Sequence, residues 1–127
     1  MANTNQGPGP GLARRRFPRR RFKRRVSVLH KGVYHLGTGV EIGEGGMLLE
    51  VGTSIAEGDM VLVNFMLPAT GISIVQAQVR STRVGEQASQ YGLLFTNLDY
   101  EGKKGIREYI SSKSVEESIE EMRRFSD

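Results

Sequence analysis

The chain has 127 residues, a formal net charge of +4, 38% hydrophobic residues and no cysteine. This length supports one small domain with a single core, and the lack of cysteine excludes disulfide bridges and thiolate metal sites. The longest apolar stretch, Met60 to Leu67, is interrupted by Asn64 and is too short to span a bilayer. We therefore expect a cytoplasmic protein with no membrane insertion.

The N-terminal part of the chain divides into a polar tail and a basic arm. Residues 1–13 are rich in Gly, Pro, Asn and Gln, which predicts a disordered tail. Residues 14–25 contain eight arginines, one lysine and no acidic residue, whereas residues 26–127 contain nine basic and 14 acidic residues, a net charge of −5. Guanidinium groups pair with phosphates and with the acceptor edge of guanine. The charge pattern therefore predicts an anion-binding arm joined to an acidic folded body.

The body begins with short β-prone runs separated by glycine-containing gaps. The six runs are Val26–Tyr34, Thr38–Ile42, Met47–Val51, Met60–Met66, Ile72–Val84 and Tyr91–Phe95. Short strands at this spacing favour an antiparallel sheet that closes on itself as a small barrel or sandwich, since closure removes exposed strand edges. With a short helix after it, this body is expected to cover residues 26–113.

Two helices are expected after the last strand. Asp99 can cap a first helix that places three apolar side chains toward the barrel, namely Ile106, Tyr109 and Ile110.

An amphipathic C-terminal helix is predicted over residues 114–127, because a capping box at Ser114–Glu117 precedes an apolar stripe formed by Val115, Ile119 and Met122. This last helix could dock on its own barrel or serve a partner. Its glutamates include like-charge pairs four residues apart, which weaken an isolated helix.

Two motifs carry the chemistry. The basic arm ends in Arg20-Arg21-Phe22-Lys23-Arg24-Arg25, and a glycine-rich corner follows at Glu41-Ile42-Gly43-Glu44-Gly45-Gly46-Met47. Together these resemble the PilZ domain family, receptors for the bacterial second messenger cyclic di-GMP. The family carries an RxxxR segment, often RRxxxR, and a [D/N]xSxxG turn. Further similar pieces are Ala56–Val63, Leu67-Pro68 and the last two strand-like runs, so the resemblance covers residues 20–110.

The resemblance implies a six-stranded antiparallel PilZ-type β-barrel with a C-terminal helix. It assigns the first motif to Arg21 and Arg25, with Arg20 as the extra leading arginine that accompanies uptake of a stacked ligand pair. It assigns the second motif to Glu41, Gly43 and Gly46, of which only the glycine is retained. Glu41 keeps a carboxylate that could accept hydrogen bonds from guanine, whereas Gly43 offers no hydroxyl.

An earlier RRxxxR register exists at Arg15–Arg20. The later register is preferred because its last arginine directly precedes the first predicted strand. Phe22, which lies between the charges, is expected to pin the arm to the barrel.

The resemblance implies a non-catalytic cyclic di-GMP receptor or adaptor in second-messenger signalling, with motility regulation as one such process. Its arginine arm is expected to fold over the dinucleotide and to signal to an unidentified protein effector. One alternative is an adaptor that has lost nucleotide binding and acts by protein contacts, and another is a nonspecific nucleic-acid clamp; specific DNA or RNA binding is not expected.

No enzyme signature is present. Glu41 and Glu44 are interpreted as one ligand acceptor and one solvated side chain. Neither a cofactor nor a metal is expected, because His30 and His35 stand at an odd spacing in a strand-like run and would face opposite sides. A surface or pairing role is expected for each histidine.

Overall fold

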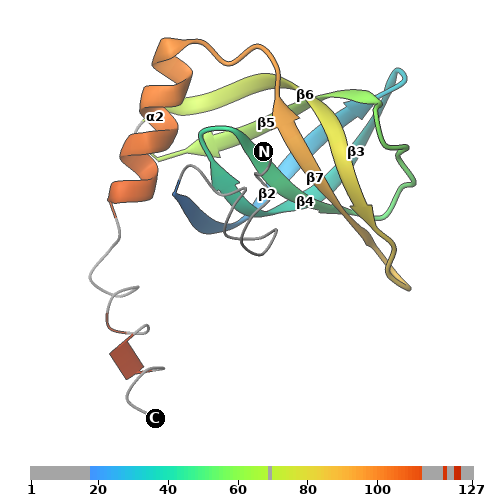
Figure 1. The fold of residues 1–127 in the computed structure, drawn as a ribbon, viewed down its shortest axis with the longest axis horizontal. Coiled ribbons are helices and arrows are strands. Elements are labelled where there is room, and N and C mark those ends of the chain that lie inside the picture. The colour runs from blue at the N-terminus through green and yellow to red at the C-terminus, as the bar shows by residue number, and fades with distance from the viewer. Residues whose placement is uncertain (1–17, 69, 113–118, 120–121, 124–127) are drawn as a thin grey trace, which may run out of the picture.

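The computed structural model describes residues 18–68, 70–112, 119 and 122–123. The strands and the helix within residues 19–111 form a closed barrel with the helix at its end (Figure 1). The elements in chain order are β2 (Arg19–His30), β3 (Val33–Gly43), β4 (Gly46–Val51), β5 (Met60–Leu67), β6 (Gly71–Arg83), β7 (Ser89–Phe95) and α2 (Tyr100–Ser111). The strands follow the order β2-β3-β4-β7-β6-β5, and all neighbours are antiparallel. The predicted six-stranded antiparallel barrel is confirmed.

The core is built from the inward residues of each strand. Alternation is clear in β5, where Val61, Val63, Phe65 and Leu67 are buried while their neighbours are more exposed. Burying a side chain of this size stabilises the fold by about 1.5–3 kcal/mol. Ring closure gives every strand two partners, so the barrel has no open edge.

The first strand begins at Arg19, seven residues before the predicted start at Val26. Basic residues were predicted to lie outside the sheet, but outward positions of a strand tolerate charge, and Phe22 supplies an inward apolar residue. The predicted run Val26–Tyr34 in fact spans two strands. Lys31 and Gly32 form the two-residue turn between them, with φ of 50° and 81°, as a hairpin turn with two positive φ values requires.

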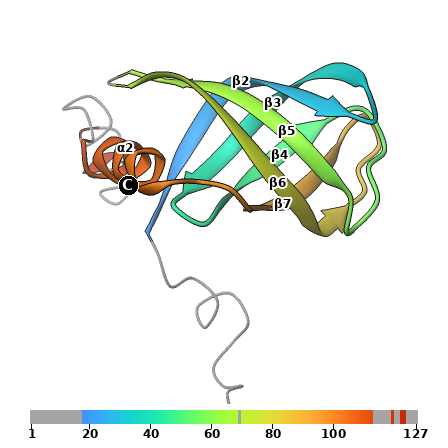
Figure 2. The same ribbon diagram turned by 90° about the horizontal axis from the view of Figure 1, so that it is seen from above.

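Helix α2 is confirmed where it was predicted. The Asp99 side chain caps it by accepting a hydrogen bond from the Gly102 amide at 2.7 Å, and Ile106 and Tyr109 are buried against the barrel. Figure 2 shows α2 at one end of the barrel, beside the start of β2 and the hairpin between β5 and β6. Gly105 makes this approach possible, because a Cβ added there would lie 2.9 Å from Thr70 Cγ2.

The expected tail at residues 1–13 and the first residues of the basic arm lie outside the described residues. The expected C-terminal helix at residues 114–127 does so as well, apart from Ile119, Met122 and Arg123. Within the described ranges, no helix is long and apolar enough to cross a membrane.

Candidate functional site

The two arginines of the RxxxR segment stand exposed on β2. The Cα of Arg21 is paired with that of Glu41 on β3, and the Cα of Arg25 with that of Thr38. Between them the register shifts at a β-bulge, and Lys23 takes a positive φ of 47°. Neither arginine forms an ion pair with another described residue. Their guanidinium groups are therefore available to an anionic ligand.

Phe22 fixes the strand that carries these arginines. Its side chain is 4% exposed and makes edge-to-face contacts with Phe65 and Tyr109, at ring-centroid distances of 5.8 and 5.7 Å. The predicted pinning role of Phe22 is confirmed. The basic segment from Arg19 onward is thus held as part of the barrel wall.

Arg20 points the other way, toward helix α2. Its side chain is buried, its Nη1 donates a hydrogen bond to the carbonyl oxygen of Tyr109 at 2.6 Å, and its Cζ lies 4.1 Å from the centroid of the Tyr109 ring. The sequence interpretation did not anticipate this contact. The signal was available, because Arg20 and Phe22 are two residues apart and must share the inward face of a strand.

Glu41 and Gly43 lie across from the basic strand. Glu41 Oε1 is 3.7 Å from Arg19 Nη1, and this oxygen is buried with no hydrogen-bond partner among the described residues. Gly43 is paired with Arg19, and a Cβ added at Gly43 would lie 3.1 Å from Arg19 Cγ. The β2–β3 pairing therefore brings Arg21, Glu41 and Gly43 to the same end of the barrel.

Gly46 has a structural reason to be glycine. It starts β4 and is paired with Leu94 of β7, and a Cβ added there would overlap the carbonyl oxygen of Leu93. A side chain at this position would thus push β4 away from β7. Gly46 supports the corner by allowing the two backbones to approach closely.

Glu44 was expected to be solvated, and this expectation is wrong. Arg107 of α2 donates two hydrogen bonds to its carboxylate, at 3.0 Å from Nε and 2.9 Å from Nη2, and the Glu44 side chain is only 13% exposed. These hydrogen bonds lower the pKa of Glu44 below its ordinary value. The pair ties the glycine corner to α2 across 63 positions of sequence, so no local spacing could have predicted it.

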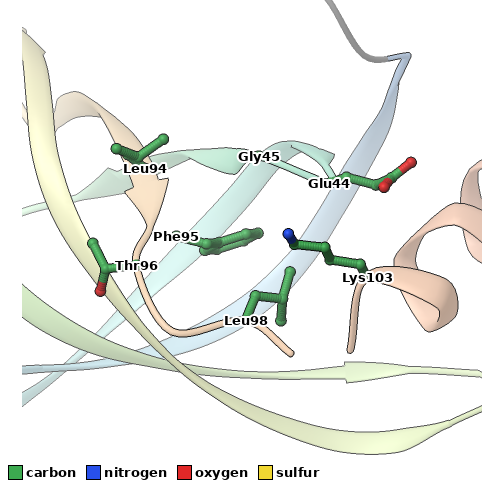
Figure 3. A pocket seen from close by; sticks show the side chains of 7 residues that line it. All are labelled: Glu44, Gly45, Leu94, Phe95, Thr96, Leu98 and Lys103. Atoms are coloured by element: carbon green, nitrogen blue, oxygen red, sulfur yellow. The ribbon is translucent and has the colours of Figure 1, made fainter. Parts of the chain in front are cut away.

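A pocket of about 210 Å³ lies beside this ion pair, between the glycine corner, the end of β7 and the start of α2. In Figure 3 Lys103 extends toward Phe95 across it. The lining residues are Glu44, Gly45, Leu94, Phe95, Thr96, Leu98 and Lys103. Three of the lining residues are apolar side chains, Leu94, Phe95 and Leu98. The charged lining residues are Lys103 and Glu44, and Glu44 is paired with Arg107.

His30 pairs with Asp59 at the opposite end of β2. Its Nε2 lies 2.9 Å from Asp59 Oδ2, and the hydrogen bond with His30 lowers the pKa of Asp59. The expected pairing role of His30 is confirmed. Within the described part of the chain, no three His, Cys, Asp or Glu side chains form a group that could hold a metal.

Comparison with protein families finds one match that covers most of the chain. The model of the PilZ domain family matches residues 13–112. This range contains both sequence motifs, all six strands and helix α2. Comparison with curated protein sequences gives no match.

Solved structures share the fold at low sequence identity. The PilZ domain of YcgR from Escherichia coli, with c-di-GMP, has a TM-score of 0.66 at 16% identity, and the match covers 87% of this chain and 98% of that one. The Bacillus subtilis inhibitor of motility MotI/DgrA has a TM-score of 0.67 at 16% identity, over 76% of this chain and 49% of that one. The K. pneumonia MrkH–c-di-GMP complex has a TM-score of 0.64 at 20% identity, over 87% and 55%. The present chain thus spans about half the length of the last two proteins.

Proposed function

Because this chain belongs to the PilZ domain family, we propose that it is a non-catalytic, cytoplasmic receptor for cyclic di-GMP that signals to a protein partner. The observation that carries the proposal is the pair of exposed guanidinium groups of Arg21 and Arg25 on one strand, without ion-pair partners among the described residues. Two solved structures with this fold, of YcgR and MrkH, are complexes with c-di-GMP.

The ligand matches these arginines chemically. Cyclic di-GMP has two phosphates and two guanines, and each guanine presents N7 and O6 as a paired acceptor edge. A planar guanidinium donates to such an edge, or to a phosphate, through two parallel hydrogen bonds. Because Phe22 anchors the strand between the two arginines, their positions are set before the ligand arrives, which reduces the entropic cost of binding.

Glu41 is the proposed acceptor on the neighbouring strand. Its Oε1 is buried without a hydrogen-bond partner in the described residues, and a guanine N1–H or N2–H would supply the missing donor. Gly43 and Gly46 contribute by allowing close approach of the backbone at this corner. Residue 43 carries no hydroxyl, and the absence of one neutral hydrogen bond costs about 1 kcal/mol, so we expect weakened but measurable affinity.

The part of the basic arm that precedes β2 is proposed to close over the bound ligand. Residues 14–16 are all arginine, and only Phe17 and Pro18 separate them from the strand that carries Arg21. Ordering of this segment on a bound anion would change the shape and charge of the surface that a protein effector meets.

Isothermal titration of the purified protein with cyclic di-GMP tests the proposal. We expect saturable binding, and we expect Arg21→Ala and Arg25→Ala each to lower the affinity ~10- to 150-fold, because each removes charge-assisted hydrogen bonds of about 1.5–3 kcal/mol. Arg80→Ala is the control, since Arg80 is also an exposed arginine but lies on β6. No binding at about 100 µM ligand, or equal affinity of the double variant and the parent, would overturn the proposal.

A further inference from the structure

An exposed apolar surface covers part of the outer wall of the barrel, across four consecutive strands, β3, β2, β5 and β6. Met66 of β5 is paired with Ile72 of β6, and Ile74 follows two residues later on the same side of β6. These three side chains are 55%, 70% and 66% exposed. With their neighbours they form a surface called here the apolar face, which consists of Leu29, Tyr34, Leu62, Met66, Ile72 and Ile74.

The rest of the apolar face continues from β5 to β3. Leu62 of β5 is paired with Leu29 of β2, which is paired in turn with Tyr34 of β3. Tyr34 is 66% exposed, and both leucines are partly exposed. The polar residues within the face, Ser27 and Asn64, are hydrogen-bonded to each other. Each large side chain offers on the order of 100 Å² of apolar area, so the face reaches several hundred Å², a size at which exposed patches mark interaction sites.

The strands beneath the apolar face carry positive charge and no negative charge. β2, β5 and β6 contain no aspartate or glutamate, and Asp59, which directly precedes β5, is paired with His30. When the β2–β5 register is extended by two residues, the exposed Arg25 lies beside Met66 at one end of the face. At the other end, Arg80 of β6 is exposed. The apolar face therefore lies between cations and suits a partner that combines apolar and anionic groups.

The shape of the apolar face favours a lipid surface over a second copy of the chain. The face is part of the outer wall of a closed barrel, so it is convex across the strands. A stable dimer needs about 800 Å² of surface from each partner, and two rigid convex faces meet over much less. A fluid bilayer adapts to a convex surface, accepts apolar side chains at the boundary of its acyl chains and offers anionic headgroups to arginine.

We propose that the apolar face binds the surface of an anionic lipid bilayer. Met66, Ile72 and Ile74 enter the boundary of the acyl chains, while Arg25 and Arg80 contact the headgroups. This binding is peripheral and needs no dinucleotide, so it does not rest on the proposed receptor function. The basic arm would attract an anionic surface by charge alone, and the test must therefore isolate the apolar contribution.

Co-sedimentation of the full chain with lipid vesicles measures the binding. The probe is vesicles of about 70% phosphatidylcholine and about 30% phosphatidylserine, and vesicles of phosphatidylcholine alone are the neutral comparison. We expect binding to the anionic vesicles that weakens at high salt, and little binding to the neutral ones. Replacing both isoleucines, by Ile72→Thr with Ile74→Thr, should lower the partition coefficient about 10-fold. Threonine is also β-branched and suits a strand, and equal thermal unfolding of parent and variant checks that the fold is retained.

Val84→Thr is the matched control. Val84 is 85% exposed, but it follows the far end of β6, about 30 Å along the strand from Ile74. We expect Val84→Thr to change the partition coefficient less than about 2-fold, because only side chains within the apolar face reach the acyl boundary.

A fluorescent label gives a second measurement that does not depend on the threonine variant. The chain has no cysteine, so a single introduced cysteine can be labelled selectively with an environment-sensitive fluorophore. We expect the emission of labelled Ile74→Cys to shift to the blue on anionic vesicles, because the label enters an apolar environment, and that of labelled Val84→Cys to stay unchanged.

Three results would overturn the proposal. The first is no co-sedimentation of the parent with anionic vesicles at low salt. The second is equal binding of parent and double threonine variant, or equal blue shifts at Ile74 and Val84, which would assign the binding to the basic arm alone. The third is a parent that is a dimer in light scattering and that the double threonine variant converts to monomers, which would identify the apolar face as a protein interface.

Discussion

Two adjacent arginines, Arg20 and Arg21, have different surroundings because successive residues of a strand face opposite sides. Arg21 is exposed on the outer face, whereas Arg20 is 9% exposed and is held by Tyr109 through a hydrogen bond and a cation–π contact. The leading arginine of the RRxxxR segment therefore holds helix α2 against the barrel in this structure. A second, stacked ligand that bound the Arg20 guanidinium would have to replace its contacts with Tyr109.

Replacing Arg20 by lysine tests this fastening. Lysine keeps the charge but lacks the planar fork that both stacks on Tyr109 and donates to its carbonyl oxygen. We expect Arg20→Lys to lower the free energy of unfolding by about 1–3 kcal/mol in urea denaturation. Arg21→Lys is the control, because an exposed arginine without a described partner should change stability by less than ~0.5 kcal/mol. Equal stability of the two variants would contradict the fastening role.

Gly46 gives a second residue-scale prediction. A methyl group at this position would overlap the Leu93 carbonyl oxygen, so Gly46→Ala must separate β4 from β7 or strain both strands. We expect Gly46→Ala to lower the free energy of unfolding by about 1–3 kcal/mol, the usual cost of overpacking, as measured by urea denaturation. Gly52→Ala is the control, since the nearest atom to its added Cβ, the Gln87 carbonyl oxygen, is 3.9 Å away. A variant as stable as the parent would show that the corner can yield.

At the scale of elements, the sequence was informative wherever the signal was local. Glycine-bounded apolar runs predicted the barrel, and Asp99 with the spacing of Ile106 and Tyr109 predicted α2. The sequence analysis placed the start of β2 too late, because a run of charged residues resembles a flexible arm. The signal of a strand was nevertheless present, since the buried Arg20 and Phe22 are separated by the exposed Arg21. The attachment of α2 through Arg107 and Glu44 depends on residues 63 positions apart, which no periodicity could bring together.

The Glu44–Arg107 pair predicts a pH dependence of stability. The pKa of Glu44 is lowered in the folded protein from its ordinary value of 4.5, first by the hydrogen bonds from Arg107. Between the folded and the unfolded pKa of Glu44, the unfolded chain therefore binds more protons than the folded protein. The stabilisation that the ion pair gives to the fold is complete above pH 4.5, and it is lost as the pH falls through the lower pKa of the folded state. Glu44→Gln cannot titrate, so its stability should fall less steeply on acidification.

Urea denaturation of parent and Glu44→Gln at pH 6 and at successive values below about 4.5 measures this difference. We expect the parent to be more stable at pH 6 and the two curves to converge in acid. Glu57→Gln is the control, since Glu57 lies in an exposed loop, and it should follow the parent. Parallel curves for parent and Glu44→Gln would show that the ion pair does not contribute to folding.

At the scale of the whole molecule, charge is divided between two regions. Residues 14–25 carry nine basic residues and no acidic one, whereas the remainder from residue 26 has a net charge of −5. A small dianion needs to contact only the basic strand and the glycine corner beside it. A long polyanion laid across the strand would run past that body and be repelled by it.

The dependence of binding on salt separates these two kinds of ligand. A duplex DNA contact that used all nine cations would release counterions at each phosphate, giving a slope of log K against log salt near −8 (about −0.9 for each phosphate). Cyclic di-GMP carries only two phosphates, so its slope should be no steeper than about −2. We expect titrations from low to physiological salt to show the shallow slope for the dinucleotide and weak, salt-sensitive retention of DNA. Tight DNA binding that survives physiological salt, together with no dinucleotide binding, would identify the basic strand as a nucleic-acid contact instead.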